Sequence, residues 1–594
     1  MHRRIWFLVV AAAAVLAVVG SATATSNRAA AAAPGTVQPF AKAWAQTPRT
    51  PAAREAKKTI TVAMEQDLSG TWNVNQASST LAWAVWVENG ILRAPYQLTN
   101  KYQYKHDLAT KVKVTKKYIR YTIRKNANWN WGGKTVPVTY KDFVYTVKAL
   151  NNSHNDVASN VGVNQIGRFT HKGQKEVTFY WKKNGQASLG GSKAAKDRKC
   201  TQDAPCGPFA DYRDLLGFVY PSVAVKGLDW NTMWPKCVCG KNGKPVSNGP
   251  YLMTNYPKGQ GVTLKANPKW YGHKPSIKTV NFKLYTQTNS EVQAIRSGEV
   301  DAAAPQPTPA LSSITHVSGI HYHVAPGNYL EHIDIQQGPH QTDPLARKPW
   351  MRQALMMGLN RKGLINAVFG QIAPGLKPLN SLLVFQSDSR YGNFFNKWNY
   401  APQKAINLLK KHGCTGGPSK PTNGNSNYFS CGGQQVTFPY TTASDNARRV
   451  ESYTVFKANL AAIGINLTDN LMPTSVMFGD TVLSAGNYSL MEFAWGGSVD
   501  PGGFVSIWGC GGGQNFLNYC NKKVTTTLNK TKTQLNAKKR NADFVNADKL
   551  MSKAVPAIPL YALPDIVTFR NGVKNLVNNP ASGFTWNIEQ WKWS

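Results

Sequence analysis

The sequence predicts a protein of two or three domains in which β-strands alternate with α-helices. Its 594 residues are too many for one hydrophobic core. Hydrophobic residues make up 42% of the chain and aromatic residues 11%, which is enough to fill several cores. Stretches of alternating apolar residues, typical of strands, follow stretches with helical spacing and capping residues.

Residues 1–24 have the layout of a secretory signal. A short basic start precedes an apolar run over residues 5–19, and small residues follow. The run is short for a transmembrane helix. We place the end of the signal at Ala24; a later cleavage or an uncleaved anchor are the alternatives. Residues 25–57, rich in Ala, Pro, Thr and Arg, predict a flexible tether.

The net charge is strongly positive, since 69 Lys and Arg stand against 30 Asp and Glu. The basic residues are scattered through loop-like sequence without the spacing of a zinc finger, an RNA-binding motif or a helix-turn-helix. We therefore expect no nucleic-acid partner. An exported protein that meets an anionic cell envelope explains the charge better. Adaptation to acid or salt is the alternative.

Eight cysteines follow the signal, and an exported chain with an even number of cysteines predicts disulfides. Three pairs each close a short loop: Cys200/Cys206, Cys414/Cys431 and Cys510/Cys520. Cys237 and Cys239 are separated by one residue, so we expect them to reach other cysteines; a Cys-x-Cys metal site is the alternative. The first cysteine is Cys200, which leaves no residue for a lipid anchor next to the signal.

The first half of the chain predicts strands around two helices. Order begins with an alternating strand at residues 59–63, and a helix is expected near 81–92. Three strands follow, at 104–108, 109–114 and 118–123. Thr139 is placed to cap a helix that starts at Tyr140, with Asp142 in its first turn.

Residues 248–301 predict a turn, two strands and a short helix that ends at Gly298. The proline-rich segment 302–315 suggests a crossing between two lobes. Beyond it, residues 344–359 predict a helix, with another starting after Asn360. A further helix is expected over 445–463, which Gly464 stops.

Several of these blocks, in this order, resemble the family 5 extracellular solute-binding proteins, which are the peptide-, oligopeptide- and nickel-binding receptors of ABC importers. They include the Asn-Gly-x-Tyr turn at 248–251, the Ser-Gly-Glu-Val-Asp segment at 297–301 and the Arg-x-Asn-x-x-Trp block at 124–129. Residues 349–361 are similar to a helix of that family, although Asn360 stands where the family usually has aspartate. The resemblance covers residues 58–594.

The resemblance implies an α/β bilobal clamp like the periplasmic binding proteins, of type II and of the large cluster with an extra subdomain. Two strands would cross between the lobes. Lobe I would comprise residues 58–301 and 559–594, with the subdomain at about 85–215, and lobe II residues 302–558. A ligand would be enclosed by hinge closure of the lobes.

The resemblance also implies a ligand site. Residues 490–501 are similar to the cleft strand and loop of lobe II, where Trp495 matches an aromatic position and Ser498 stands at the place of an aspartate that binds a peptide amine. The glycines that follow Trp495 would leave one face of its ring open, as a cleft platform needs. Asp500 is a substitute for that aspartate or, as the more favoured interpretation, a turn residue. The full set of expected ligand-binding residues is Glu65, Gln66, Asn248, Gly249, Trp495, Gly496, Gly497, Ser498, Asp500 and Tyr561.

The sequence offers two further hypotheses, a metal site and an enzyme. His321 and His323 on one strand would point to the same face, which suits a metal, but a half-exposed strand explains them equally well. Motifs of serine hydrolases, zinc proteases, nucleotide-binding loops and calcium loops are missing from the sequence. We therefore expect no catalysis and no cofactor.

The function that these observations favour is an exported receptor for a peptide or similar organic solute. Its partners would be that ligand, an ABC permease and the anionic cell envelope, with the protein secreted or retained at the envelope. Two alternatives stay open. One is a secreted, wall-associated protein that cleaves or binds carbohydrate, and the other is a receptor for a metal complex.

Overall fold

The computed structural model describes residues 58–67, 70–76, 79, 81–194, 198–201, 205–338, 344–479, 481–497 and 501–594. The predicted signal at 1–24 and the predicted tether at 25–57 lie outside this part of the chain. No helix within the described ranges is long and apolar enough to cross a membrane.

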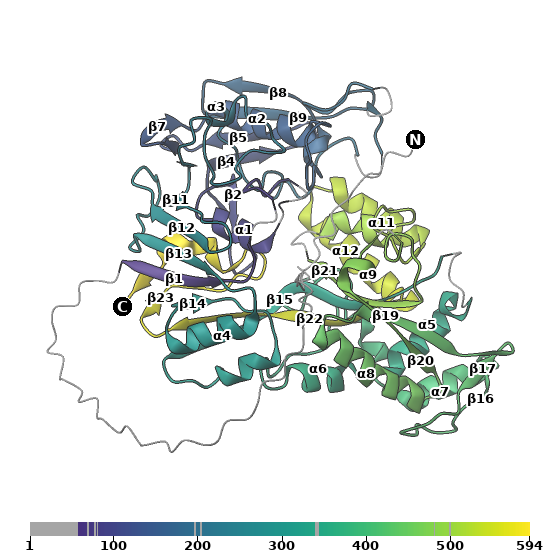
Figure 1. Ribbon diagram of the computed structural model, residues 1–594. Coiled ribbons are helices and arrows are strands. Elements are labelled where there is room, and N and C mark those ends of the chain that lie inside the picture. The colour runs from purple at the N-terminus through teal and green to yellow at the C-terminus, as the bar shows by residue number, and fades with distance from the viewer. Residues whose placement is uncertain are drawn as a thin grey trace, which may run out of the picture.

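A ten-stranded mixed sheet runs through both halves of the molecule (Figure 1). Its strands are, in spatial order, β11 (Tyr251–Asn255), β12 (Gly261–Ala266), β13 (Thr279–Leu284), β1 (Thr59–Met64), β14 (Ala302–Ala303), β22 (Ala557–Arg570), β15 (Ile320–Ile335), β21 (Leu490–Gly496), β19 (Thr437–Ala443) and β20 (Asn466–Met472). We call the part from β11 to β14, with its attached elements, lobe I, and the part from β21 to β20 lobe II.

In lobe I, the predicted first strand is confirmed as β1, which lies between β13 and β14 and runs parallel to both. The helix α4 (Thr288–Ser297) follows β13. It ends at Gly298, whose φ of +84° is the left-handed conformation that glycine adopts without strain. The predicted stop at this glycine is therefore confirmed.

A subdomain is attached to lobe I (Figure 1). Its four-stranded sheet has the order β4 (Ala109–Val114), β5 (Tyr118–Ile123), β9 (Glu176–Trp181) and β8 (Ile166–Lys172), and the helix α2 (Tyr140–Asn151) packs beside it. The predicted cap of α2 is confirmed. The Thr139 hydroxyl accepts the Lys141 N–H at 3.3 Å, and the Asp142 carboxylate accepts the Thr139 N–H at 2.8 Å.

Lobe II surrounds its part of the sheet with helices (Figure 1). They are α5 (Pro349–Gly358), α6 (Arg361–Phe369), α7 (Pro402–Lys411), α8 (Ala447–Ala462), α11 (Lys522–Thr533) and α12 (Ala537–Ala554). The start of α6 is as predicted, because the Asn360 side chain accepts the Gly363 N–H at 2.8 Å. The predicted helix over 445–463 is confirmed as α8, and Gly464 follows it with φ +78°.

Two long antiparallel strands join the lobes. β15 and β22 pair from Ile320 opposite Arg570 to Asp334 opposite Ala557. The C-terminal end of β22 pairs with β14 of lobe I, whereas the C-terminal half of β15 pairs with β21 of lobe II. Their mutual register is interrupted between Pro326 and Leu330. Such an irregularity locally releases the ladder and is a natural place for a bend.

The proline-rich segment 302–315, which we predicted to cross between the lobes, does not do so. Its first residues form β14 of lobe I, and the 3-10 helix η4 (Pro309–Ser313) packs against α4. The prediction was wrong because prolines do not by themselves mark a crossing: Pro326, Pro559 and Pro564 lie in the strands that do cross, whereas the segment after β14 turns onto α4. The crossing is made instead by the next segment, β15, whose backbone groups pair with β22.

The three short-loop disulfides are present as predicted, at Cys200–Cys206, Cys414–Cys431 and Cys510–Cys520. The expectation for the other two cysteines was wrong, because Cys237 and Cys239 bond to each other. With six cysteines already paired in their own loops, each of these two finds its only remaining partner two residues away.

Candidate functional site

A cavity of about 340 Å³ opens between lobe I and the crossing strands. Half of the lining residues come from α1 (Ala82–Glu88), β2 (Tyr96–Leu98), β3 (Tyr104–His106) and the segments between and after them. The loop at 213–218 and the C-terminal segment at 581–586 complete the lobe I side. Asn328 of β15 and Gly497, just after β21, contribute from the hinge and lobe II.

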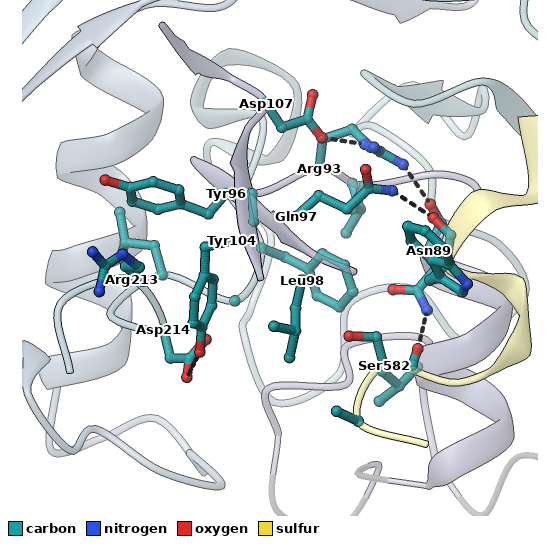
Figure 2. Close-up of a pocket in the computed structure, with 18 of the residues that line it drawn as sticks. Asn89, Arg93, Tyr96, Gln97, Leu98, Tyr104, Asp107, Arg213, Asp214 and Ser582 are labelled. Atoms are coloured by element: carbon teal, nitrogen blue, oxygen red, sulfur yellow. Dashed lines mark hydrogen bonds and ion pairs between the residues drawn. The ribbon is translucent and has the colours of Figure 1, made fainter. Parts of the chain in front are cut away.

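Three polar groups of residues mark the edges of this cavity. Figure 2 shows Arg93 with Asp107 at one edge, Asn89 with Ser582 at a second, and Arg213 with Asp214 at a third. Because they come from sequence positions up to several hundred residues apart, only the fold brings them together.

Arg93 and Asp107 form a nearly buried ion pair in the wall. The Arg93 Nε donates to Asp107 Oδ2 at 2.5 Å, and Glu589 lies 3.9 Å from the same guanidinium. Tyr271 also donates to Asp107, at 2.8 Å. Burial alone lowers the pKa of Arg93, but the charges of Asp107 and Glu589 outweigh it and raise this pKa above its ordinary value. The guanidinium therefore stays charged and already has its partners.

Asn248 and Gly249 stand behind this pair. The Asn248 side chain accepts the Arg93 N–H at 2.9 Å, and the Gly249 N–H donates to Ile91 at 2.9 Å. A Cβ at Gly249 would come within 2.7 Å of the Gly90 carbonyl oxygen, so only glycine allows this approach. The two residues shape the wall from outside and are not among those that line the cavity.

Side-chain amides tie the separate segments of the wall together. Asn89 donates to the Ser582 carbonyl at 2.7 Å and Gln97 to the Trp586 carbonyl at 2.5 Å. At the hinge, Asn328 donates to the Gly497 carbonyl at 3.1 Å and accepts the Gly497 N–H through its backbone at 2.6 Å. The wall is thus held in place before any ligand enters, which limits the entropy that binding costs.

Tyrosine rings surround the third edge. The Tyr96 ring lies 6.1 Å from Tyr104 and 6.5 Å from Tyr212, centre to centre. The Arg213 guanidinium lies over two of these rings, 4.8 Å from Tyr212 and 5.8 Å from Tyr104. Burial and Tyr212 raise the pKa of Tyr96 to about 12, although Arg213 opposes the shift. This edge is therefore aromatic and partly dry, and it carries one cation, Arg213, beside one exposed carboxylate, Asp214.

Of the predicted ligand-binding residues in the described part of the chain, Gly497 lines this cavity and the others lie elsewhere. A Cβ at Gly497 would meet Phe385 at 2.2 Å. Gly496 lines a much smaller gap of about 10 Å³ beside it. Ser498 and Asp500 lie outside the described residues.

Glu65 and Gln66, predicted as ligand-binding residues, directly follow β1 in lobe I. Glu65 accepts hydrogen bonds from the Thr288 hydroxyl at 2.9 Å and from the Gln306 N–H at 3.1 Å. The Gln66 side-chain oxygen is buried, with no hydrogen-bond partner in the described part of the chain. Neither residue lines the cavity.

Trp495 and Tyr561 are packed into lobe II. Trp495 is 4% exposed and lies against Phe493 and Phe516, with ring centres 5.2 and 6.0 Å away. Tyr561 is fully buried, and Arg448 donates to its hydroxyl at 3.5 Å. The open ring face that we expected for Trp495 is thus covered by neighbouring aromatic residues.

His321 and His323 lie exposed on β15, their ring centres 6.2 Å apart, and both contact Phe569. Within the described ranges, three or more His, Cys, Asp or Glu side chains do not come together as a group that would hold a metal ion. The alternating histidines are therefore placed as one side of a strand that faces solvent.

The wall residues Tyr96, Tyr104, Arg213 and Trp586 were missed by the sequence analysis. A signal existed in the Asp-Tyr-Arg-Asp run at 211–214, which combines an aromatic residue with both charges soon after a disulfide loop. That pattern is common on protein surfaces, so the sequence alone did not distinguish a cavity wall from a solvated loop.

The family model for bacterial extracellular solute-binding proteins, family 5, matches residues 103–516, which is more than half of the chain. The chain belongs to this family. The resemblance noted from the sequence is therefore confirmed, and family 5 proteins are extracellular by their description.

Among curated relatives, this family 5 protein is 27% identical over 334 residues to Di/tripeptide-binding protein 2 of Pseudomonas aeruginosa (strain UCBPP-PA14). That match spans 54% of this chain and 56% of the relative, little more than half of its length. The oligopeptide-binding protein OppA of Bacillus subtilis (strain 168) is 21% identical over 495 residues, with 79% of this chain and 82% of OppA covered.

Solved structures of the family share the fold. The periplasmic EDTA-binding protein EppA matches with a TM-score of 0.74 at 20% identity, over 91% of this chain and 97% of EppA. The oligopeptide-binding protein AppA from Bacillus subtilis, in complex with a nonapeptide, matches with a TM-score of 0.66 at 16% identity, over 91% and 100%. The bilobal clamp with two crossing strands is thus confirmed.

Proposed function

We propose that this family 5 protein is an exported receptor that captures a peptide or similar organic solute and delivers it to an ABC permease. The observation that carries the proposal is the cavity of about 340 Å³ whose wall takes residues from lobe I, from the hinge and from the end of β21. A site of that size, formed where two lobes meet, suits a small solute enclosed by hinge motion. Several relatives are named for the peptides they bind.

Lobe closure would act through the crossing strands. The irregular pairing between Pro326 and Leu330 lies next to Asn328, which reaches the cavity. At a second, smaller cavity of about 130 Å³, the Ala210 N–H of the subdomain donates to the Lys532 carbonyl of α11 at 2.9 Å, so the two lobes meet there directly. This contact would open and close as solute leaves and enters.

The division into lobes follows the crossing strands. We assign residues 58–301 and 559–594 to lobe I, with the subdomain at about 85–215, and residues 302–558 to lobe II. Two elements of the second range, β14 and η4, pack on lobe I, and the long strands β15 and β22 serve both lobes. Gly497, with Ser498 and Asp500 beyond it, would supply the lobe II side of the site.

The protein would carry out no chemistry on its ligand. Its excess of basic residues, 69 against 30 acidic ones, would hold the exported chain near an anionic envelope and close to its permease. Salt at several hundred millimolar would weaken that retention because it screens exposed charges.

The test is native mass spectrometry of the protein from its exporting host, before and after mild denaturation. A released small molecule of defined mass supports the receptor proposal and gives the ligand class. If the protein is empty, thermal shift with peptides, sugars and metal chelates follows. A polymer that is cut while no small solute raises the melting temperature would overturn the proposal in favour of a secreted carbohydrate-active protein.

A further inference from the structure

Four charged side chains line the cavity: Arg93, Asp107, Arg213 and Asp214. They differ in the ion pairs and hydrogen bonds that they already make within the protein. Arg93 and Asp107 bind each other at 2.5 Å, and the first of them also has Glu589 nearby. Asp214 accepts a hydrogen bond from the Tyr104 hydroxyl.

Arg213 is the exception. Its half-buried guanidinium makes no ion pair with a carboxylate in the described part of the chain. It is positioned instead by the rings of Tyr212 and Tyr104, at 4.8 and 5.8 Å. Tyr104 is itself held by its hydrogen bond to Asp214. The two rings therefore position the guanidinium, and its N–H groups form no ion pair with a carboxylate within the described ranges.

The neighbouring carboxylate, Asp214, is exposed and accepts from the Tyr104 hydroxyl. A partly desolvated guanidinium that no carboxylate pairs with directly favours an incoming anion. The planar fork of its N–H groups matches a carboxylate with two parallel hydrogen bonds. Two tyrosine rings restrict its motion, so less entropy is lost when the anion binds.

We propose that Arg213 binds a carboxylate of the captured solute and so determines that the ligand is a small carboxylic acid, such as a short peptide with a free C-terminus. This inference rests on the receptor function proposed above, and it adds the charge class of the ligand. The anchor lies on the 205–218 loop of lobe I, whose Ala210 also touches α11 of lobe II.

The experiment pairs each probe with its amide. Alanine di-, tri- and tetrapeptides, and gluconate as a sugar acid, are compared with their carboxamides. The full chain is first unfolded and refolded to remove retained solute, and affinities are measured by isothermal titration calorimetry. We expect wild-type protein to bind its best acid roughly 10- to 100-fold more tightly than the matching amide.

Arg213→Met should abolish that preference and bring the ratio of acid to amide affinity close to one, and Arg213→Lys should keep part of it. Arg168→Met is the matched control. Arg168 also stacks on a tyrosine, 3.6 Å from the Tyr180 ring, but it does not line the cavity. We expect that variant to keep the wild-type ratio, because only the cavity arginine meets the solute.

The outcomes separate the two proposals. If wild-type protein binds a probe but takes acid and amide equally, the role of Arg213 is overturned and the receptor function stands; that comparison needs no variant. An unchanged ratio in Arg213→Met has the same meaning. If no probe binds to wild-type protein, and no small molecule is released from the exported chain, both proposals fail.

Discussion

Two networks of buried charged residues lie on opposite sides of the hinge, and they differ in how their carboxylates and guanidiniums are paired. In lobe I, one guanidinium, Arg93, serves two carboxylates, Asp107 and Glu589. In lobe II, two guanidiniums serve a pair of carboxyl groups. Arg449 donates to Glu331 at 2.7 Å and Arg448 to the same residue at 3.3 Å, while the neighbouring Glu492 accepts from Tyr440 at 2.8 Å.

The protonation of the two networks differs. Burial and the nearby charge of Glu331 raise the pKa of Glu492 to about 8, whereas the guanidiniums hold the pKa of Glu331 below its ordinary value despite its burial. At neutral pH the lobe II network therefore contains one charged carboxyl, Glu331, and one largely neutral carboxyl, Glu492. In lobe I the pKa of Arg93 is raised, so this cation keeps its charge throughout the range in which proteins are studied.

The two networks also differ in their position relative to the cavity. The lobe I network lines the cavity and presents a wall whose cation does not titrate near neutral pH. The lobe II network ties α8 to strands β15 and β21 next to the hinge and does not line the cavity. We expect substitutions in lobe II to act on folding and those in lobe I to act on both folding and binding.

The largest effect should come from Arg449→Met. It leaves the carboxylate of Glu331, which is fully buried, with only the longer contact to Arg448. Breaking a buried pair from one side costs about 3–5 kcal/mol of unfolding free energy. Urea unfolding followed by circular dichroism measures it. Adding Glu331→Gln in the same background should recover part of the loss, and a loss below about 1 kcal/mol would contradict the importance of this pair.

Glu492→Gln should remove a pH dependence. The pKa of Glu492 is near 8 in the folded protein and about 4.5 in the unfolded chain, so between these values the folded state holds a proton that the unfolded state has released. The unfolding free energy of the wild type therefore falls as pH rises through this window, by up to about 1.4 kcal/mol per pH unit from this group. Below pH 4.5 the contribution is fully present.

Urea unfolding at pH 5, 6, 7 and 8 checks this effect. The advantage of Glu492→Gln over wild type should grow with pH. Glu331→Gln serves as the opposite control, because a lowered pKa stabilises the folded state above the unfolded pKa. Parallel stability curves for wild type and Glu492→Gln would show that Glu492 does not hold a proton in the folded protein.

Asp107→Asn should have the next largest effect. It removes the closest counter-charge of Arg93 and weakens a charge-assisted hydrogen bond, which costs roughly 1.5–3 kcal/mol. Asp214→Asn is the control, because Asp214 lines the same cavity but is exposed, and it should change stability by less than about 0.5 kcal/mol. Equal losses in the two variants would mean that the buried pair adds nothing to the stability of the wall.

The sequence predicted the supporting elements better than the site. Features that depend on residues close together in the chain were predicted correctly. They are the helix cap at Thr139, the helix ends at Gly298 and Gly464, and three disulfides. The Cys237–Cys239 bond was missed because cysteines separated by one residue seldom bond each other, although the three predicted pairs leave these two no other partner.

The cavity wall depends on contacts that no local pattern shows. Gln97 meets Trp586, and Asn89 meets Ser582, across almost the whole length of the chain. Trp495 suggested an open platform because glycines follow it, yet Phe493 and Phe516 cover its ring. Local sequence indicates which residues are suited to a cleft, whereas long-range packing decides which of them reach it.

The smallest expected effect on stability is that of a neutral hydrogen bond in the lobe I wall of the cavity. Gln97→Ala removes the amide that donates to the Trp586 carbonyl at 2.5 Å, a neutral hydrogen bond worth about 1 kcal/mol. Unfolding free energy should fall by that amount, and solute affinity should fall as well because the C-terminal segment is no longer held against the wall. Gln403→Ala, whose side chain lies exposed on α7 far from the cavity, is the matched control. If Gln97→Ala lowers stability but leaves the affinity for a carboxylate solute unchanged, the wall is assembled without this bond, and the charged residues alone set the binding geometry.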